Sequence, residues 1–211
     1  ARNCSISTSI SMAERNRRGT RKIIGMQKLL NSAIDDATDL LVRVRALAPQ
    51  LQALGEAMMR CWQARGKVLT CGNGGSCADA IHLAEELCVR FCKERKGLAA
   101  IALADGSALT CAANDYGWER VFSRQVEALG NPGDVLVCFT TSGNSQNVIA
   151  AVAAARKIGM TTCVFLGKDG GKLKGACDIE LHVPHTLNHR VQEMHLLLYH
   201  TLCEWVDARV E

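Results

Sequence analysis

The residues best suited to chemistry follow a short glycine-rich turn, "CGNGGS", at residues 71–76. The segment after the turn carries His82 and Glu86, which are four residues apart and therefore share one face of a helix. A histidine and a carboxylate on one helix face can ligate a metal ion together or transfer protons side by side. Taken singly, His82 could be a partly buried histidine, and Glu86 could be a solvated charge beside Glu85. Their position behind the turn favours a functional role.

A second turn of the same kind, "FTTSGNS", covers residues 139–145. Glycine lets the backbone approach a ligand closely, and hydroxyl groups together with the free amides of a helix start can surround a phosphate dianion. The alternative is that Ser76 and Ser145 only cap the helices that follow. Because both turns are expected at the same edge of a sheet, phosphate binding is the better interpretation. The expected donors of the second turn are Thr140, Thr141, Ser142 and Ser145.

The two turns also exclude some ligands. Neither continues into the Gly-Lys-Ser/Thr of a Walker loop, and neither matches G-x-G-x-x-G, so a nucleotide is not indicated. Both lack lysine, which phosphoryl transfer usually needs to neutralise the charge on the transferred group. We therefore expect a phosphosugar whose phosphate stays intact while another part of the molecule reacts.

The elements that must position these residues appear beyond residue 66 as short apolar runs alternating with helical patterns. The expected strands are residues 67–71, 98–103, 134–140, 161–166 and 179–183. The expected helices are residues 76–92, 117–129, 144–158 and 188–208. Apolar strands separated mostly by helices predict an α/β fold with a doubly wound, five-stranded parallel sheet. Such folds bind ligands at the carboxyl ends of their strands, where the strand order reverses.

The part of the chain before residue 66 is expected to be helical or irregular. Apolar residues recur at helical spacing from 26 to 65 and predict a pair of helices broken near "APQ" at residues 48–50. Residues 1–25 are basic and rich in serine and asparagine, which predicts a disordered tail. We expect residues 26–211 to form one domain that includes the helical pair.

Composition limits the partners and the compartment. The net charge of +4 comes from the basic tail, so the body has no broad basic face and we expect no nucleic-acid partner. No apolar run is long enough to span a membrane, and no secretory signal is evident. The 11 cysteines are expected to be reduced and mostly buried, because several lie in or beside apolar strands. A cytoplasmic protein without a membrane partner is the prediction.

At this level of detail the sequence resembles a sugar isomerase (SIS) domain, and more closely the phosphoheptose isomerases, over residues 26–208. The motifs that carry the resemblance are "CGNGGSCADAIHLAEEL", "NDYGWERVFSRQVEALGNPGDVL", "TTSGNSQNVIAAVAAARKIGM", "GKDGGKL" and "RVQEMHLLLYH". It implies a flavodoxin-like SIS domain, a homotetramer with active sites at subunit interfaces, and conversion of D-sedoheptulose 7-phosphate to D-glycero-D-manno-heptose 7-phosphate.

The resemblance also assigns roles to residues. It implies a metal site, usually filled by zinc, one per active site, with Glu86 and the second histidine also serving as acid and base. The implied metal ligands are His82, Glu86, Gln192 and His200, and the implied catalytic pair is Glu86 and His200. The implied substrate-binding residues are Asn73, Gly74, Gly75, Ser76, Asn114, Asp115, Thr140, Thr141, Ser142, Ser145 and Gln192.

The last helix leaves two points open. Gln192 and His200 are eight residues apart, about 12 Å along a helix, so they meet one ion only if both reach inward or if one belongs to a neighbouring subunit. A late-helix histidine can also simply favour the negative end of the helix dipole. In addition, Leu187 occupies a position that is commonly aspartate in this family, where Asn188 or His189 would have to substitute.

The predicted mechanism is proton transfer between C1 and C2 through an enediol, with Glu86 as the base and His200 shuttling protons on the sugar oxygens. A metal at this site would polarise the carbonyl group. The main alternative is a non-catalytic SIS adaptor like those that associate with the bacterial replication initiator. Such relatives generally lack the glutamate and histidine found here as Glu86 and His200, so we favour the enzyme. A sugar-sensing regulator is less favoured, because no clear DNA-binding domain precedes residue 66.

Overall fold

The computed structural model describes residues 13–15 and 21–210, with side chains from residue 24 onward. The chain divides into two compact units between Asp39 and Leu40, a point inside helix α1. In the first unit, strands β1 (Ala13–Arg15) and β2 (Arg21–Ile23) pair antiparallel. Residues 1–12 and 16–20 of the predicted disordered tail lie outside the described residues, and the prediction of one domain over 26–211 stays a prediction.

The helical pair predicted before residue 66 is present. Helix α1 covers Met26–Val44, a 3-10 turn η1 covers Arg45–Leu47, and α2 covers Ala48–Gln63. Pro49 lies in the first turn of α2, where its missing N–H costs no helical hydrogen bond. The break near residue 48 is therefore confirmed, and its cause is local.

The second unit contains a five-stranded, all-parallel sheet in the order β4-β3-β5-β6-β7. The strands are β3 (Val68–Gly72), β4 (Ala100–Ala102), β5 (Val135–Thr140), β6 (Thr161–Leu166) and β7 (Ile179–His182). All five end within two residues of the predicted runs. Strands β3, β5 and β6 are buried on both faces almost throughout, as expected of central parallel strands, whereas the edge strands β4 and β7 are partly exposed. The predicted doubly wound sheet is confirmed.

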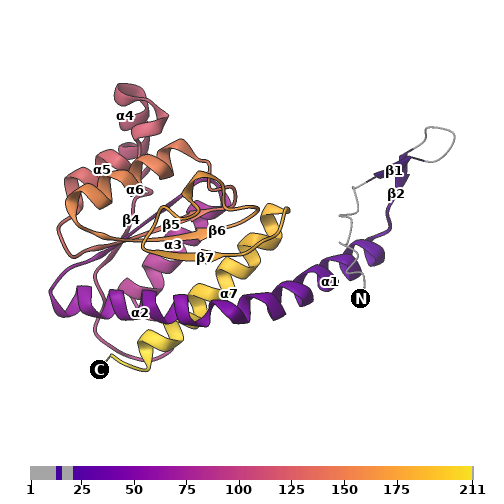
Figure 1. Ribbon diagram of the computed structural model, residues 1–211, viewed down its shortest axis with the longest axis horizontal. Helices are drawn as coiled ribbons and strands as arrows, with labels where there is room; N and C mark the ends of the chain where they lie inside the picture. The colour runs from indigo at the N-terminus through magenta and orange to yellow at the C-terminus, as the bar shows by residue number, and fades with distance from the viewer. Residues whose placement is uncertain (1–12, 16–20, 211) are drawn as a thin grey trace. The chain divides into compact units, whose positions relative to one another are not determined.

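Helices cover both faces of this sheet (Figure 1). One core packs α2, α3 (Gly75–Cys88) and α7 (Asn188–Asp207) against the sheet. The opposite core packs α4 (Gly106–Tyr116), α5 (Ser123–Leu129) and α6 (Gln146–Ile158). Short 3-10 turns lie at Trp118–Arg120 (η2) and Gly171–Leu173 (η3). None of the helices in the described ranges is long and apolar enough to cross a membrane.

Three helix predictions need correction. Helix α4 was not predicted; Asp105 begins it by accepting a hydrogen bond from the N–H of Ala108 at 2.8 Å. The predicted helix at 117–129 is instead the turn η2 followed by α5. The predicted helix at 76–92 ends at Cys88, where the Arg95 guanidinium donates to the carbonyl oxygens of Glu86 and Leu87.

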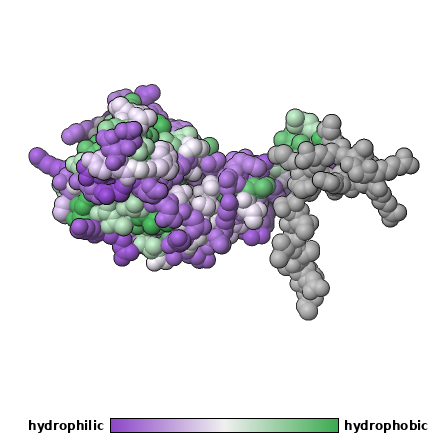
Figure 2. All heavy atoms as spheres, turned by 90° about the horizontal axis from the view of Figure 1, so that it is seen from above, coloured by the Kyte–Doolittle hydropathy of each residue, from purple (hydrophilic) through white to green (hydrophobic). Residues whose placement is uncertain are grey.

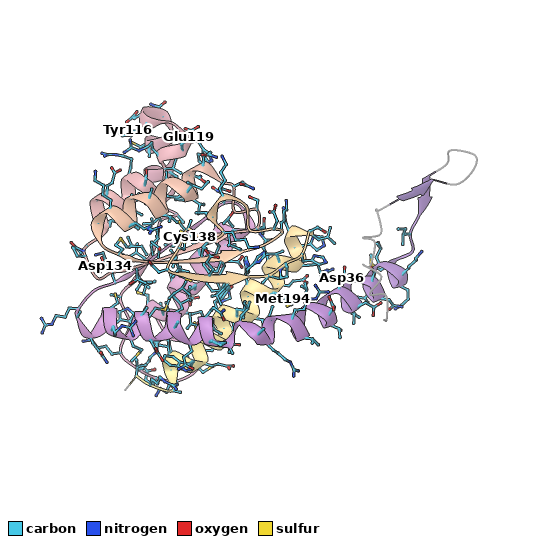
Figure 3. The ribbon with its side chains drawn as sticks, viewed as in Figure 1. Asp36, Tyr116, Glu119, Asp134, Cys138 and Met194 are labelled. Carbon is cyan, nitrogen blue, oxygen red and sulfur yellow. The ribbon has the colours of Figure 1, made fainter. Side chains whose placement is uncertain are left out.

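Half of the described cysteines are buried, and Cys88, Cys92 and Cys111 are exposed. Cys71 and Cys138 are register partners on neighbouring strands, with Sγ atoms 3.5 Å apart, and both are fully buried. Figure 3 labels Cys138 within the sheet. All ten cysteines whose state is described are free thiols.

Candidate active site

The two glycine-rich turns leave the sheet side by side. Strands β3 and β5 are neighbours in parallel register, with Gly72 opposite Phe139, so both turns follow the carboxyl ends of adjacent strands. The chain order reverses here, because β4 lies on the outer side of β3 while β6 and β7 lie beyond β5. This is the switch point at which α/β folds bind ligands, as the sequence predicted.

A small cavity of about 90 Å³ opens between the turns. Pockets for drug-sized ligands usually measure about 300–1,000 Å³, so this cavity suits one group of a substrate rather than a whole sugar phosphate. Its lining residues carry mostly amide and hydroxyl groups, with one phenylalanine among them. The lining residues are Asn73, Ser76, Phe139, Thr140, Thr141, Ser142 and Ser145.

The serines of the cavity do not cap the helices that follow them. Ser145 is the N-cap residue of α6, but its side chain makes no capping hydrogen bond. Ser76 is the second residue of α3, which begins after Gly74, and its Oγ lies 3.5 Å from the Gln192 amide nitrogen. The simple capping role that the sequence left open therefore fails for both, and their hydroxyls can face a ligand.

The remaining hydroxyls are oriented by the backbone of the second turn. The N–H of Gly143 donates to Thr140 Oγ1 at 3.2 Å, and the N–H of Asn144 donates to Ser142 Oγ at 3.2 Å. A hydroxyl that accepts such a bond still has its own hydrogen to donate. Because phosphate oxygens only accept, these two groups are suited to a phosphate.

An amide pair that the sequence analysis missed joins the two turns. Asn147, in the first turn of α6, exchanges hydrogen bonds with Asn73: each side-chain nitrogen donates to the other's oxygen at 2.9 Å. Asn147 is 2% exposed, and its oxygen also accepts the N–H of Val148. The signal that could have found it is an asparagine in the first turn of an otherwise apolar helix, where burial requires a polar partner.

The "GKDGGKL" segment supports the second turn from outside. Gly143 has a φ of +63°, and a Cβ there would lie 1.8 Å from the carbonyl oxygen of Gly170. The Asn144 side chain accepts the N–H of Lys172 at 3.2 Å. Only a glycine fits this close contact, so the motif shapes the turn.

A second polar cluster lies further along α3. His82 Nε2 is 3.0 Å from Glu86 Oε1, and the His82 and His200 rings meet edge to face with centroids 5.0 Å apart. One possible ligand atom from each of His82, Glu86 and His200 lies within 4.8 Å of the others. The structure thus brings together both residues predicted on α3 and the predicted histidine of α7 within a single chain.

The surroundings of His200 favour a neutral imidazole. Its Nε2 is buried and has no hydrogen-bond partner among the described residues. Burial and the neighbouring His82 lower the pKa of His200, while Glu86 and Glu204 act in the opposite direction. A neutral ring can accept a proton or ligate a metal through its free lone pair, so this protonation state suits both roles.

The donor set fits a zinc ion. Two imidazoles and one carboxylate form the ligand set of many catalytic zinc sites, which leave a further position for water or substrate. The orphaned Nε2 of His200 also lacks the partner that an ion would supply. The residues present therefore agree with the group that the resemblance implies.

Two polar residues beside this cluster were not singled out from the sequence. The Tyr199 hydroxyl lies 3.0 Å from His82 Nδ1. Asp79, one turn before His82 on α3, has a buried Oδ2 without a hydrogen-bond partner among the described residues, and burial raises its pKa to about 6 although His82 opposes this. Neither shows a sequence signal, because their proximity to His82 depends on how α3 and α7 pack.

Three other predicted site residues, Gly74, Gly75 and Gln192, lie together at the first turn. Gly74 is the N-cap residue of α3, with a φ of +57°. A Cβ on Gly75 would lie 2.5 Å from the Gln192 amide nitrogen, so Gln192 covers the first turn. Its position fits substrate binding, and its role as a metal ligand stays a prediction. Leu187 is the N-cap residue of α7 without a capping side chain, and its N–H donates to His185 Nδ1 at 3.2 Å.

Asn114 and Asp115 do not line the cavity. Both are exposed near the end of α4, where the Asn114 amide donates to Asp115 at 2.8 Å. Figure 3 labels the next residue, Tyr116, at the end of α4 and away from α7. In a single chain, this pair is therefore separate from the His82 cluster.

Comparison with known proteins identifies the family to which the chain is related. The SIS domain family model matches residues 34–167. Phosphoheptose isomerase of Proteus mirabilis is 44% identical over 189 residues, covering 88% of this chain and 98% of its own length.

Two solved structures agree with this relationship. Phosphoheptose isomerase GmhA from Neisseria gonorrhoeae aligns with a TM-score of 0.81 and 42% identity, over 87% of this chain and all of its own. A phosphoheptose isomerase from Francisella tularensis aligns with a TM-score of 0.85 and 37% identity, over 88% of this chain and all of its own. With the cavity and the His82 cluster, these similarities show that the chain belongs to the phosphoheptose isomerase family of SIS-domain proteins.

Proposed function

We propose that this protein is an aldose–ketose isomerase that converts D-sedoheptulose 7-phosphate to D-glycero-D-manno-heptose 7-phosphate. The observation that carries the proposal is that one helix, α3, serves both the hydroxyl-lined cavity and the His82–Glu86–His200 cluster. Ser76 and His82 are six residues apart, about 9 Å along the helix axis. A sugar phosphate held by its phosphate can extend from the cavity toward the cluster with its other end.

The cavity holds the phosphate in this proposal. Ser76, Thr140, Ser142 and Ser145 donate hydroxyl hydrogens, and Thr141 adds a polar contact. The free amides at the start of α6 add the positive end of the helix dipole. No lysine lines the cavity, which suits a phosphate that binds and stays intact. The sugar extends out of the cavity past four residues that are proposed to contact it: Asn73, Gly74, Gly75 and Gln192.

The proton transfer is assigned to Glu86 and His200. Isomerisation takes a proton from one of two adjacent carbons and returns it to the other, so one base can serve both steps. The Glu86 side chain is 16% exposed, which shields the transferred proton from exchange with bulk water. His200, neutral and with an unpaired Nε2, exchanges protons with the sugar oxygens and assists ring opening.

We further propose one zinc ion per active site, held by His82, Glu86, Gln192 and His200. When bound, it would polarise the substrate carbonyl group. The grouped ligand atoms of the two histidines and the glutamate support this assignment. The Gln192 amide nitrogen lies 3.5 Å from Ser76 Oγ at the first turn of α3, and its place among the ligands is carried over from the resemblance alone.

The active form is proposed to be a cytoplasmic homotetramer with its sites at subunit interfaces. Exposed apolar side chains flank the cluster on both helices: Ile81 on α3 is 47% exposed, and Leu196 and Leu197 on α7 are 37% and 40% exposed. A neighbouring subunit on this surface would cover them and close the site from solvent. It would also give Asn114 and Asp115 a route to the substrate that a single chain does not provide.

Turnover of sedoheptulose 7-phosphate, with and without a chelator, tests the proposal. We expect the purified protein to form the heptose product, and the chelator to abolish turnover until zinc is returned. Absence of turnover in the zinc-loaded protein would overturn the isomerase assignment and leave the non-catalytic adaptor. Undiminished turnover after complete metal removal would overturn the zinc assignment alone.

A further inference from the structure

The Tyr199 hydroxyl is fixed against the ring nitrogen of His82 that faces away from Glu86. Its oxygen lies 3.0 Å from Nδ1, while Nε2 faces Glu86 at 3.0 Å. The Tyr199 ring is 1% exposed and packs edge to face against Phe139, with centroids 5.9 Å apart. A ring held in the core in this way allows the hydroxyl little freedom to leave His82.

These two contacts specify the tautomer of a neutral His82. A carboxylate only accepts hydrogen bonds, so the contact with Glu86 requires the ring hydrogen on Nε2. Nδ1 then carries a lone pair and accepts the hydrogen of the Tyr199 hydroxyl. In this arrangement, Nε2 has no lone pair for a metal or for a proton.

The functional form of His82 needs the opposite tautomer. For Nε2 to ligate an ion, the ring hydrogen must be on Nδ1, and Tyr199 must accept it and direct its own hydrogen elsewhere. Asp79 offers the acceptor: its Oδ2 is buried and has no partner among the described residues. Asp79 lies three residues before His82 on α3, so the two side chains share one face of that helix.

We propose that Tyr199 and Asp79 are positioning residues that set the tautomer of His82, with the Tyr199 hydroxyl donating to Nδ1 in the metal-free protein and accepting from it when Nε2 binds an ion. A hydroxyl serves both states because it is donor and acceptor at once. Partners of this kind, behind a metal-binding histidine, commonly contribute 10–100-fold to metal affinity. The inference rests on the proposed role of His82 as a metal ligand.

Zinc affinity, measured by competition with a chromogenic chelator, is the first test. Tyr199→Phe keeps the packed ring and removes only the hydroxyl, and we expect it to bind zinc about 10–100-fold more weakly. The matched control is Tyr116→Phe, which alters the only other tyrosine of the chain, an exposed residue on α4. Wild-type affinity in Tyr199→Phe would overturn the proposal.

The nitrogen spectrum of His82 is the second test and requires no activity. In metal-free protein with ¹⁵N-labelled histidines, we expect the Nδ1 resonance of His82 to move to that of an unbonded ring nitrogen in Tyr199→Phe. His82→Gln assigns the resonance. An unchanged Nδ1 resonance would show that the hydroxyl does not bind this nitrogen.

Two Asp79 variants keep the proposal testable if Tyr199→Phe fails to fold. Asp79→Asn retains an oxygen that can accept from Tyr199, whereas Asp79→Leu has a similar size and no acceptor. We expect zinc affinity to fall in the order wild type, Asp79→Asn, Asp79→Leu. Equal affinities in all three would overturn the role of Asp79. The two proposals can fail separately. If the variants bind zinc more weakly but the wild type does not turn over sedoheptulose 7-phosphate, this inference is upheld and only the isomerase function is refuted.

Discussion

Glu86 and its neighbour Glu85 show how position on a helix determines what a carboxylate can do. Glu85 faces solvent, whereas Glu86 faces the Nε2 of His82 at 3.0 Å inside the cluster that includes His200. The two side chains are chemically identical and adjacent in sequence. Only the direction in which α3 presents them separates a solvated charge from a candidate base.

Replacing Glu86 by glutamine tests the base directly. Glu86→Gln preserves the size of the side chain but cannot take a proton from carbon, so we expect kcat to fall by a factor of about 10²–10⁴. Initial rates with sedoheptulose 7-phosphate measure this. Glu85→Gln is the matched control and should retain wild-type kcat. Full turnover by Glu86→Gln would refute the assignment.

His195 carries a pH dependence of stability that is separate from catalysis. It is fully buried, and its Nε2 lies 3.1 Å from the carbonyl oxygen of Leu166. Burial lowers its pKa to about 4, with the Leu166 carbonyl acting in the opposite direction. In the unfolded chain a histidine takes up a proton below about pH 6.5, so the unfolded state gains protons first as the pH falls.

Stability should therefore decrease as the pH falls from about 6.5 to about 4, and His195 should account for about 3 kcal/mol of that loss. Urea unfolding at several pH values measures the free energy of unfolding. His195→Gln, which can still donate to Leu166, should flatten this part of the profile, while the exposed His189→Gln should not. A wild-type slope in His195→Gln would contradict the prediction.

At the scale of elements, α3 is fixed at both ends. Its first turn contacts Gln192, and its last turn is held by Arg95, whose guanidinium donates to the carbonyls of Glu86 at 2.8 Å and Leu87 at 3.0 Å. Arg95 also donates to Asp207 on α7 at 2.6 Å, with side chains 0% and 6% exposed respectively. This buried pair holds the end of α3 beside the helix that carries His200.

Breaking the buried pair should destabilise the fold. Arg95→Met leaves the Asp207 carboxylate buried without its counter-ion, and we expect a loss of about 3–5 kcal/mol in the free energy of unfolding. The double variant Arg95→Met/Asp207→Leu removes both charges and should recover part of that loss. Denaturant unfolding measures each variant.

The neighbouring loop offers a matched control for this prediction. Arg90 and Glu94 form an exposed pair at 3.4 Å, with side chains 58% and 87% exposed. Arg90→Met should change the free energy of unfolding by less than about 1 kcal/mol. If Arg95→Met were equally mild, or if the double variant were less stable than Arg95→Met alone, the buried pair would not have the structural role assigned to it.

At the scale of the whole molecule, the sheet separates two cores. The site lies where the strands have their carboxyl ends, on the face of the sheet that α3 and α7 cover. On the face drawn in Figure 2, apolar residues reach the surface in small patches among polar ones. The exposed Ile81 and Leu197 flank the His82 cluster on different helices. If these two side chains become buried when subunits associate, then the complete site forms in the oligomer and not in the separate chain.

Charged substitutions on this surface should therefore separate subunits and reduce activity together. We expect the wild type to have about four times the mass of one chain in light scattering, and Ile81→Lys or Leu197→Lys to shift it to smaller species with weaker turnover. The control is Leu129→Lys on α5, which is 38% exposed on the opposite side of the sheet. Dissociated subunits with full activity would contradict an interfacial site.

The sequence by itself determined the sheet, the two turns and the members of the cluster. The five strands were predictable because each is a short apolar run, and the central β3 and β5 are buried on both faces. The turns were predictable because glycine and hydroxyl residues gather at strand ends, where the backbone must approach a ligand. His82 and Glu86 were recognisable together because residues four apart share a helix face. Helix α4 escaped prediction, since its signal is one capping residue, Asp105.

Only the tertiary structure decided which polar groups meet across elements. Asn147 pairs with Asn73 over a separation of 74 residues, and Tyr199 contacts His82 over 117. Periodicity reports which face of an element is buried, but it does not report which neighbouring element that face meets. The packing of α7 on α3 brought His200 to His82 within one chain, and the same packing placed Tyr199 and Asp79 behind the cluster. Contacts between residues so far apart in the sequence depend on the packing of the whole core, because every element between two such residues affects their relative positions.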